Sequence, residues 1–446
     1  MKETRASFAL LFFIIAAHIA YFLPQVSIKS EVSQSYSVTT CPGAVNDSRS
    51  TALLPSRQVG IRELVRANAS FTKPTTSNPA LTRGAIIVQG DPRNSWVIQT
   101  KASRWTSAAT CTAGAASSWF VGGTANVTSQ GKLILVNSGL SDAIVEVASY
   151  SESGPSEPRS ITVKALTERE IRIDSLLPGA DRLVVKVKVI SGRVTSFLFD
   201  ERVRGLNNIG GDFVAPIATP SRELVIAGLP ATFGSSSTIT RTLRLMSTDE
   251  VDTNVSVEVL SREGVYVPVE LGNIEINAGE VVDIPLQNLD LGKGNFGLKL
   301  TATSAIVAAL LSEVKSGSVS DFMWSAPSPA FDNVSFNIYG LEPSITFIGD
   351  EIRARIQWRS RDGKGFTENL SGEEILNWRV PANTRLITIS NLSGSNLSGS
   401  NLSGTRAGMS WLTSDGVAHI PIESAATLES AARPRADISV IQPRTK

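Results

Sequence analysis

The sequence predicts an all-β protein: an N-terminal transmembrane helix followed by tandem Ig-like antiparallel β-sandwich domains. Three observations predict this class. A single long apolar run, residues 6–23, stands at the N-terminus. Short segments elsewhere alternate apolar and polar residues, as in Val185-Lys-Val-Lys-Val189, and a period of two places one strand face in a core and the other in water. A β-rich pattern also recurs after roughly 110 residues, about the length of one sandwich domain.

Residues 1–24 are expected to be a signal anchor. Two basic residues, Lys2 and Arg5, precede the apolar run, which ends at Pro24. The run is longer than the ~7 to 15 residues of a signal-peptide core and close to the ~20 that cross a bilayer. A cleaved signal peptide is the alternative, although His18 would stand at an unfavourable position for cleavage. Both interpretations export the body, so we expect a single-pass cell-membrane protein with an extracytoplasmic C-terminal body, or a secreted protein after cleavage.

Residues 25–35 are short and polar and are expected to be a tether. Residues 36–125 are predicted to form an N-terminal β-domain, because strand-like runs alternate there with turn-forming residues. This domain holds both cysteines of the chain, Cys41 and Cys111. In an oxidising compartment they are expected to form a disulfide across about 70 residues, worth a few kcal/mol. Two unpaired buried thiols are the alternative, and two cysteines without nearby histidines are too few for a metal site.

Residues 126–215 and 216–328 are predicted to be β-sandwich repeats 1 and 2. Four pairs of segments carry the repeat, and each pair has the same apolar pattern and the same kind of turn. The pairs are Lys132–Gly139 with Thr242–Asp249, Val145–Gly154 with Val257–Gly264, Glu170–Asp174 with Val281–Ile284, and Gly192–Glu201 with Ser304–Glu313.

Residues 329–424 are predicted to be a more degenerate repeat 3. The motif Asn-Leu-Ser-Gly occurs three times between Asn391 and Thr405. Aligned with repeat 2, this run falls on the connecting loop at 290–294, and its composition predicts a loop lengthened by duplication. A stacked β-solenoid would need more copies to bury a core. Residues 425–446 are expected to be a mobile C-terminal tail.

The sequence predicts no cofactor, no nucleic-acid partner and no enzymatic activity. The 42 Lys and Arg residues balance 41 Asp and Glu residues, which removes the basic footprint of a nucleic-acid-binding protein. Residues 292–297 match a dinucleotide-binding glycine pattern, but a strand-like segment follows where a helix is required. His419 is the one histidine outside the apolar run, and it is expected to be an exposed strand residue rather than a catalytic base.

Tryptophans of the N-terminal domain give an alternative function. Trp96, Trp105 and Trp119 lie in or beside strand-like runs, where core packing is the common fate of tryptophan. If all three were exposed on one face, they would contact glycan, and the protein would be a glycan-binding envelope protein. A second alternative, an envelope glycosidase, requires two facing carboxylates in a cleft.

Several short motifs together resemble the actinobacterial envelope proteins grouped as domain of unknown function 5719. They are Cys41-Pro-Gly43, Trp119–Gly123, Leu135–Gly139, Asp200–Leu206, Leu224–Pro230 and Asp321–Pro327. The resemblance implies export and an envelope role and supplies no catalytic residues. This sequence departs from the family at Asn137-Ser-Gly139, where the family tends to have Asn-Pro-Gly.

Asp200 and Arg202 lie in the connection between repeats 1 and 2. We predict that they form a structural pair at the inter-repeat junction, with a binding site as the alternative. The sequence as a whole therefore predicts a non-enzymatic extracytoplasmic cell-envelope protein with a structural or protein-interaction role. Its expected partners are the membrane, through residues 1–24, and envelope proteins or cell-wall glycan.

Overall fold

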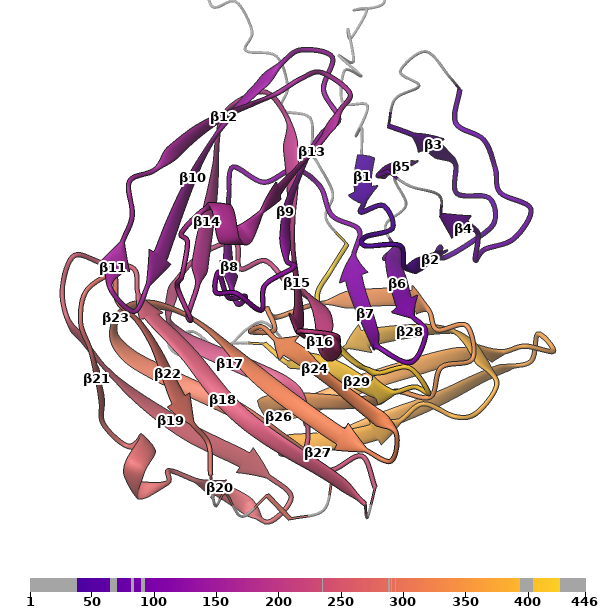
Figure 1. Cartoon of the computed structure of the whole chain (residues 1–446). Helices are drawn as coiled ribbons and strands as arrows, with labels where there is room; N and C mark the ends of the chain where they lie inside the picture. The colour runs from indigo at the N-terminus through magenta and orange to yellow at the C-terminus, as the bar shows by residue number, and fades with distance from the viewer. Residues whose placement is uncertain are drawn as a thin grey trace, which may run out of the picture. The chain divides into compact units, whose positions relative to one another are not determined.

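The computed structural model describes residues 38–425, except 65–69, 82–83, 90–92, 235, 288, 290, 293 and 394–403. The described chain consists of antiparallel β-strands and two short 3-10 helices (Figure 1), which confirms the all-β prediction for this part. No helix among the described residues has the length and apolarity to span a bilayer. The predicted signal anchor, the tether, the tail after residue 425 and most of the Asn-Leu-Ser-Gly run lie outside the described residues.

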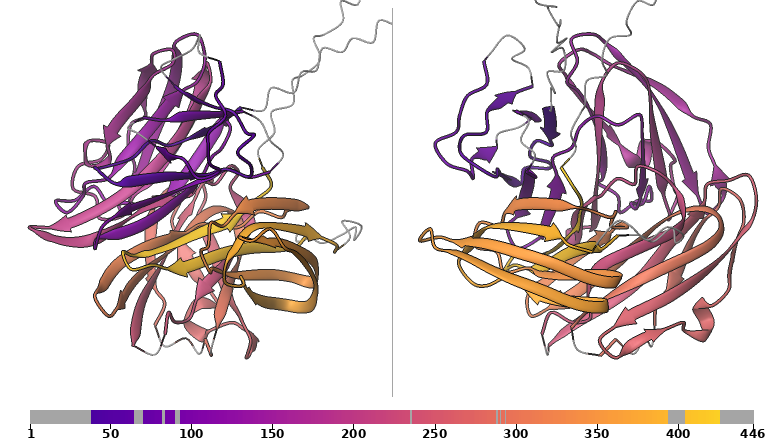
Figure 2. Two further views of the ribbon diagram at one scale, coloured as in Figure 1. Left: turned by 90° about the vertical axis from the view of Figure 1, so that its right-hand side faces the viewer. Right: turned by 180° about the vertical axis from the view of Figure 1, so that it is seen from behind.

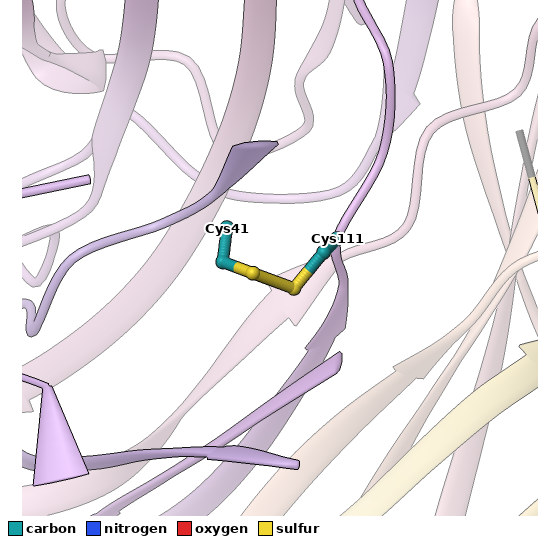
Figure 3. The surroundings of a disulfide bond; sticks show 2 residues. All are labelled: Cys41 and Cys111. Atoms are coloured by element: carbon teal, nitrogen blue, oxygen red, sulfur yellow. A yellow bond between two sulfur atoms is a disulfide. The ribbon is translucent and has the colours of Figure 1, made fainter. Parts of the chain in front are cut away.

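Two small sheets form the N-terminal part, residues 38–110. One has the order β1-β5-β3 and the other β4-β2-β6-β7. Cys41 at the end of β1 and Cys111 directly after β7 form a disulfide (Figure 3), which confirms the predicted pairing. Both cysteines are buried in a core that also includes residues of the next part, such as Phe199. The strands are β1 (Val38–Cys41), β2 (Arg49–Leu53), β3 (Ile61–Glu63), β4 (Ala80–Leu81), β5 (Ile86–Gln89), β6 (Trp96–Lys101) and β7 (Trp105–Thr110).

Residues 117–214 form the first β-sandwich. One sheet has the order β11-β10-β14-β8, with β12 also paired to β10, and the other has the order β13-β9-β15-β16. Alternate residues of both sheets meet in one core, as Val145 and Leu198 illustrate. The strands are β8 (Ser117–Val121), β9 (Lys132–Asn137), β10 (Ala143–Ser151), β11 (Gly154–Pro155), β12 (Arg159–Val163), β13 (Glu168–Arg172), β14 (Val184–Ser191), β15 (Val194–Arg204) and β16 (Asn207–Val214).

Residues 221–325 repeat the same strand pairing. Strand β23 takes the place of β14 and β15 together: its first half pairs with β17 and β19, and its second half with β18 and β24. The four segment pairs aligned in the sequence therefore lie on equivalent strands. The strands of this second β-sandwich are β17 (Ser221–Pro230), β18 (Ser237–Ser247), β19 (Thr253–Ser261), β20 (Gly264–Tyr266), β21 (Ile274–Ile276), β22 (Val281–Pro285), β23 (Asn295–Ser316) and β24 (Val319–Ser325).

Residues 333–422 form a six-stranded antiparallel sheet with longer strands, which we call the third sandwich. Strand β26 pairs along its whole length with β27, and also with β28 and β29. Strands β28 and β29 thus occupy the place of the two halves of β23. The Asn-Leu-Ser-Gly run follows β28, so its predicted alignment with the loop at 290–294 is wrong by one strand. The strands are β25 (Asn333–Asn337), β26 (Ser344–Ser360), β27 (Gly365–Arg379), β28 (Thr384–Asn391), β29 (Arg406–Leu412) and β30 (Val417–Ile422).

The described residues fall within one compact unit. Strands from all four parts meet in it: β7 contacts β16, β24 and β30, β24 also contacts β16 and β30, and β17 contacts β29. Figure 2 shows these parts from two further sides, with the orange and yellow C-terminal strands next to the preceding ones. The approach of β17 to β29 is backbone to backbone, because a Cβ atom on Gly408 would lie 2.1 Å from the carbonyl oxygen of Ala227.

Candidate functional site

A buried polar cluster, which we call the central junction, lies where β7, β16, β24 and β30 meet. Its centre is Asp321 on β24. One carboxyl oxygen, Oδ2, accepts hydrogen bonds from the backbone N–H groups of Thr106 (3.1 Å) and Val417 (3.0 Å), and Oδ1 accepts one from Gly211 (3.1 Å). The donors lie on β7, β30 and β16. A single side chain is therefore hydrogen-bonded to the other three parts of the molecule.

Asp212 on β16 is the second acid of the central junction. Its Oδ1 accepts from the Ser107 hydroxyl (2.8 Å), and its Oδ2 accepts from the backbone N–H of Trp324 (2.7 Å). Burial raises the pKa of both Asp212 and Asp321 well above the ordinary carboxyl value, and hydrogen bonds from N–H groups oppose this rise. The negative charge of Asp321 raises the pKa of Asp212 further.

Asp200 and Arg202, predicted to mark the inter-repeat junction, lie together on β15. Arg202 donates to Asp200 Oδ2 from Nη2 (2.7 Å) and from Nε (3.1 Å). The same oxygen accepts a hydrogen bond from the indole nitrogen of Trp324 (2.9 Å), and the Arg202 guanidinium lies 4.8 Å from the Phe322 ring centre. The pair thus joins the first sandwich to β24 of the second.

The three tryptophans of the glycan-binding alternative are buried, with exposed fractions of 2% for Trp96, 0% for Trp105 and 5% for Trp119. Trp105 donates to Glu201 (2.9 Å), which also accepts from Lys101 (3.0 Å). Trp96 donates to a backbone carbonyl of β25 and packs edge-on against another tryptophan of the third sandwich. A glycan surface needs these rings exposed on one face, and this condition is not met. Trp96 and Trp105 instead fill contacts between parts of the chain.

His419 is buried, so the expectation of an exposed strand residue is wrong. Both faces of β30 are covered by neighbouring strands. The imidazole Nε2 is 2.8 Å from the carbonyl oxygen of Ala227, which can only accept, so Nε2 carries the proton. Burial lowers the pKa of His419 to about 4, and the side chain is neutral at pH 7. It serves as a contact between β30 and β17.

A cavity of about 440 Å³ lies beside the central junction. Segments of all three sandwiches and of the N-terminal part line it, and its charged side chains are Glu223, Arg406 and Glu423. Burial raises the pKa of Glu423 to about 7 although part of the side chain faces the cavity. Burial lowers the pKa of Arg406, and Glu223 opposes this change. A carboxyl group that titrates near pH 7 and a guanidinium could donate hydrogen bonds to a bound ligand.

Sequence reasoning missed the residues that matter most here. Asp321 stood in a motif used for the family resemblance but was not singled out as a site. Asp212 follows two glycines in the segment Ile209–Val214 of β16, where it is the one charged residue, and a charge at a core position was the available signal. No local pattern marks Glu423. Within the described ranges, no group of three or more His, Cys, Asp or Glu side chains is placed to hold a metal ion.

Comparison with known proteins identifies the family. The model of a family of unknown function, DUF5719, matches residues 72–342, which is more than half of the chain. The chain belongs to this family. The matched region includes Asp200, Asp212 and Asp321 of the central junction, whereas the Cys41 motif precedes it. This confirms the family that the sequence motifs indicated.

No curated protein matches this DUF5719 member. A search of solved structures found the Streptomyces avermitilis alpha-L-rhamnosidase complexed with L-rhamnose, at 9% sequence identity and a TM-score of 0.12. The alignment covers 84% of this chain and 57% of that chain. At this TM-score the similarity supports no inference about fold or activity.

Proposed function

We propose that this DUF5719 protein is a non-enzymatic module of the cell envelope that acts as a rigid structural or protein-interaction body. The observation that carries the proposal is the use of the buried acids. The carboxyl oxygens of Asp321 and Asp212 accept hydrogen bonds from N–H and O–H groups on other strands. An acid occupied in this way holds elements together and has no free oxygen for a substrate.

The proposal includes export and a tandem Ig-like architecture of the three sandwiches. A disulfide between Cys41 and Cys111 suits an oxidising compartment, because thiols stay reduced in the cytosol of most organisms. Residues 1–24 supply the membrane anchor in this proposal, and the body lies outside. The partners are envelope proteins or cell-wall glycan, and the balanced charge of the chain gives no reason to invoke nucleic acid.

Export is tested by adding protease to intact spheroplasts that express the full chain. We expect the body, detected by an antibody against the third sandwich, to be degraded without lysis, while a cytosolic marker is retained. Protection of the body until lysis would refute the proposed topology. Interaction is tested by placing a photo-crosslinking residue at Leu206, fully exposed at the tip of the β15–β16 hairpin. A discrete crosslinked species is expected there and not at the buried Leu198.

One observation favours a second candidate function, an envelope glycosidase. Glu223 and Glu423 line the same cavity, and the pKa of about 7 on Glu423 is the property of a general acid near neutral pH. Hydrolysis of chromogenic glycosides by the purified chain, abolished in both Glu423→Gln and Glu223→Gln, would support this candidate. Release of sugar that is equal in wild type and both variants, or absent in all three, would remove it.

A further inference from the structure

Four arginines surround two adjoining cavities away from the central junction. The cavities have volumes of about 440 and 390 Å³ and share Thr76 and Arg385 in their linings. Arg57 comes from a loop of the N-terminal part, and the other three arginines come from the third sandwich. Arg359 lies on β26, Arg361 in the turn after it, and Arg385 on β28. We call this group the arginine pocket.

The charges of the arginine pocket have no acidic partner among the residues that the structure describes. Among the described residues, neither cavity lining contains an Asp or Glu side chain. None of the four arginines forms an ion pair with a described carboxylate, whereas nearby basic residues do: Arg353 pairs with Glu351, Lys364 with Asp362 and Arg379 with Glu342. The whole chain has 42 basic and 41 acidic residues. A basic composition therefore does not account for an acid-free cluster.

Buried polar side chains form the floor of the arginine pocket and fix Arg385. The guanidinium of Arg385 donates from Nη2 to the Ser77 hydroxyl (3.1 Å), which donates to Asn78 Oδ1 (2.8 Å). Ser77 and Asn337 are 8% and 2% exposed, and Asn337 donates to the backbone carbonyl of Leu54 (2.9 Å). These bonds cross from the third sandwich to the N-terminal part. Arg385 is thus oriented before any ligand arrives.

Polar residues complete the lining around the four cations. Ser56, Thr75 and Thr76, which carry hydroxyl groups, line the cavities, and Asn78 lines the second cavity with its Oδ1 accepting from the Ser77 hydroxyl. The site therefore offers donors and positive charge, and its natural complement is an acceptor-rich anion.

We propose that the arginine pocket binds a phosphate group carried by a ligand. A guanidinium pairs two parallel N–H donors with two oxygens of a phosphate, and charge-assisted bonds of this kind are the strongest hydrogen bonds in proteins. Four guanidiniums exceed what one carboxylate can satisfy, whereas a phosphate dianion offers more acceptor oxygens and charge. In this proposal the phosphate occupies the first cavity, which Arg57, Arg359 and Arg385 line, and Arg361 of the adjoining cavity adds positive charge beside it. This inference is independent of export and of the absence of catalysis.

The test is calorimetric titration of the full chain with inorganic phosphate and, separately, with a glycerophosphodiester, at low ionic strength. Saturable binding at one site is expected, weakening as salt is added. Tighter binding of inorganic phosphate would indicate a free phosphate or monoester as the ligand, and tighter binding of the diester a phosphodiester polymer. Sodium acetate at the same concentration is expected to bind more weakly than either.

Variants decide whether the pocket is the site. Arg359→Gln with Arg385→Gln is expected to weaken phosphate binding by about tenfold or more. The matched control is Arg353→Gln with Arg355→Gln, which removes the same charge from β26 outside both linings, and it should leave the dissociation constant unchanged. Arg57→Gln, on an exposed loop, provides the test if the first double variant fails to fold. Equal weakening in pocket and control variants, or no saturable binding of either phosphate probe to wild type, would overturn the proposal.

Discussion

Replacing Asp321 tests whether the central junction holds the four parts together. In Asp321→Asn, the amide nitrogen takes the place of one carboxyl oxygen and turns an acceptor into a donor. If the amide nitrogen takes the position of Oδ1, it faces the backbone N–H of Gly211, a donor facing a donor. If it takes the position of Oδ2, it faces the N–H groups of Thr106 and Val417. The cheaper orientation loses one buried hydrogen bond, which costs about 1–3 kcal/mol. Asp321→Ala leaves all three donors unpaired, so its cost should be at least about 3 kcal/mol.

Urea unfolding followed by both tryptophan fluorescence and far-UV circular dichroism measures these costs. Trp105 and Trp324 are buried beside the junction, so fluorescence reports on it directly. Asp249→Asn is the control, because its carboxylate accepts one backbone N–H in an exposed turn (3.0 Å); its effect should stay within about 0.5 kcal/mol. The reasoning is refuted if Asp321→Asn and Asp321→Ala are as stable as this control.

Three further predictions concern pH, the disulfide and close packing. The pKa of Glu423 is raised from 4.5 to about 7, so its stabilising contribution is full below 4.5 and is lost as pH rises to 7; relative to wild type, Glu423→Gln should gain about 3 kcal/mol across that window. The pKa of His419 is lowered from 6.5 to about 4, so its contribution is full above 6.5 and is lost as pH falls to 4; His419→Gln should gain about 3 kcal/mol in that direction. Replacing Cys41 and Cys111, 70 residues apart, by alanine should cost about 2–5 kcal/mol in urea unfolding. Gly416→Ala should cost about 3 kcal/mol, since the new Cβ would lie 2.0 Å from an oxygen of Asp321.

Each of these predictions has a result that would contradict it. The two pH predictions are tested by measuring the unfolding free energy of each variant relative to wild type as a function of pH. If this difference changes with pH in the same direction for Glu423→Gln and His419→Gln, then burial does not act with opposite sign on an acid and a base. For the cystine, reductant should lower the stability of wild type to that of the variant and leave the variant unchanged, and a variant that still responds to reductant would contradict the prediction. For Gly416, the control Gly365→Ala adds a Cβ with nothing within 4 Å and should be neutral.

The local pattern of apolar and polar residues was enough to predict the strands and the repeat. Alternation in segments such as Val185–Val189 follows from one covered face, and the first two copies share turns at the same positions. The third copy defeated the alignment because β26 runs without interruption through residues 344–360, where the second sandwich uses the two strands β18 and β19. β27 therefore ends at Arg379, and Thr384 begins the strand equivalent to the first half of β23.

Contacts between the parts lay beyond local pattern. The alternation around His419 predicts a strand, which the structure confirms as β30, yet the sequence carries no sign that β17 covers its second face. The sequence around Trp96 and Trp105 does not distinguish a buried tryptophan from an exposed one. The structural roles of Asp212 and Asp321 depend on hydrogen-bond donors in other parts of the chain, more than 90 residues away. A single sequence shows these residues but does not show which of them lie close together in the fold.

The spacing of the Asp321 donors sets an order of assembly for a chain that emerges N-terminus first. The cystine can close once residue 111 is available, whereas the carboxylate of Asp321 gains its last donor only when Val417 appears. At ~5–20 residues per second, this interval lasts on the order of tens of seconds. Until then the acid has to remain hydrated, since burying it incompletely paired costs several kcal/mol. Burial of Asp321 by the docking of β24 is therefore disfavoured until β30 can supply the N–H of Val417.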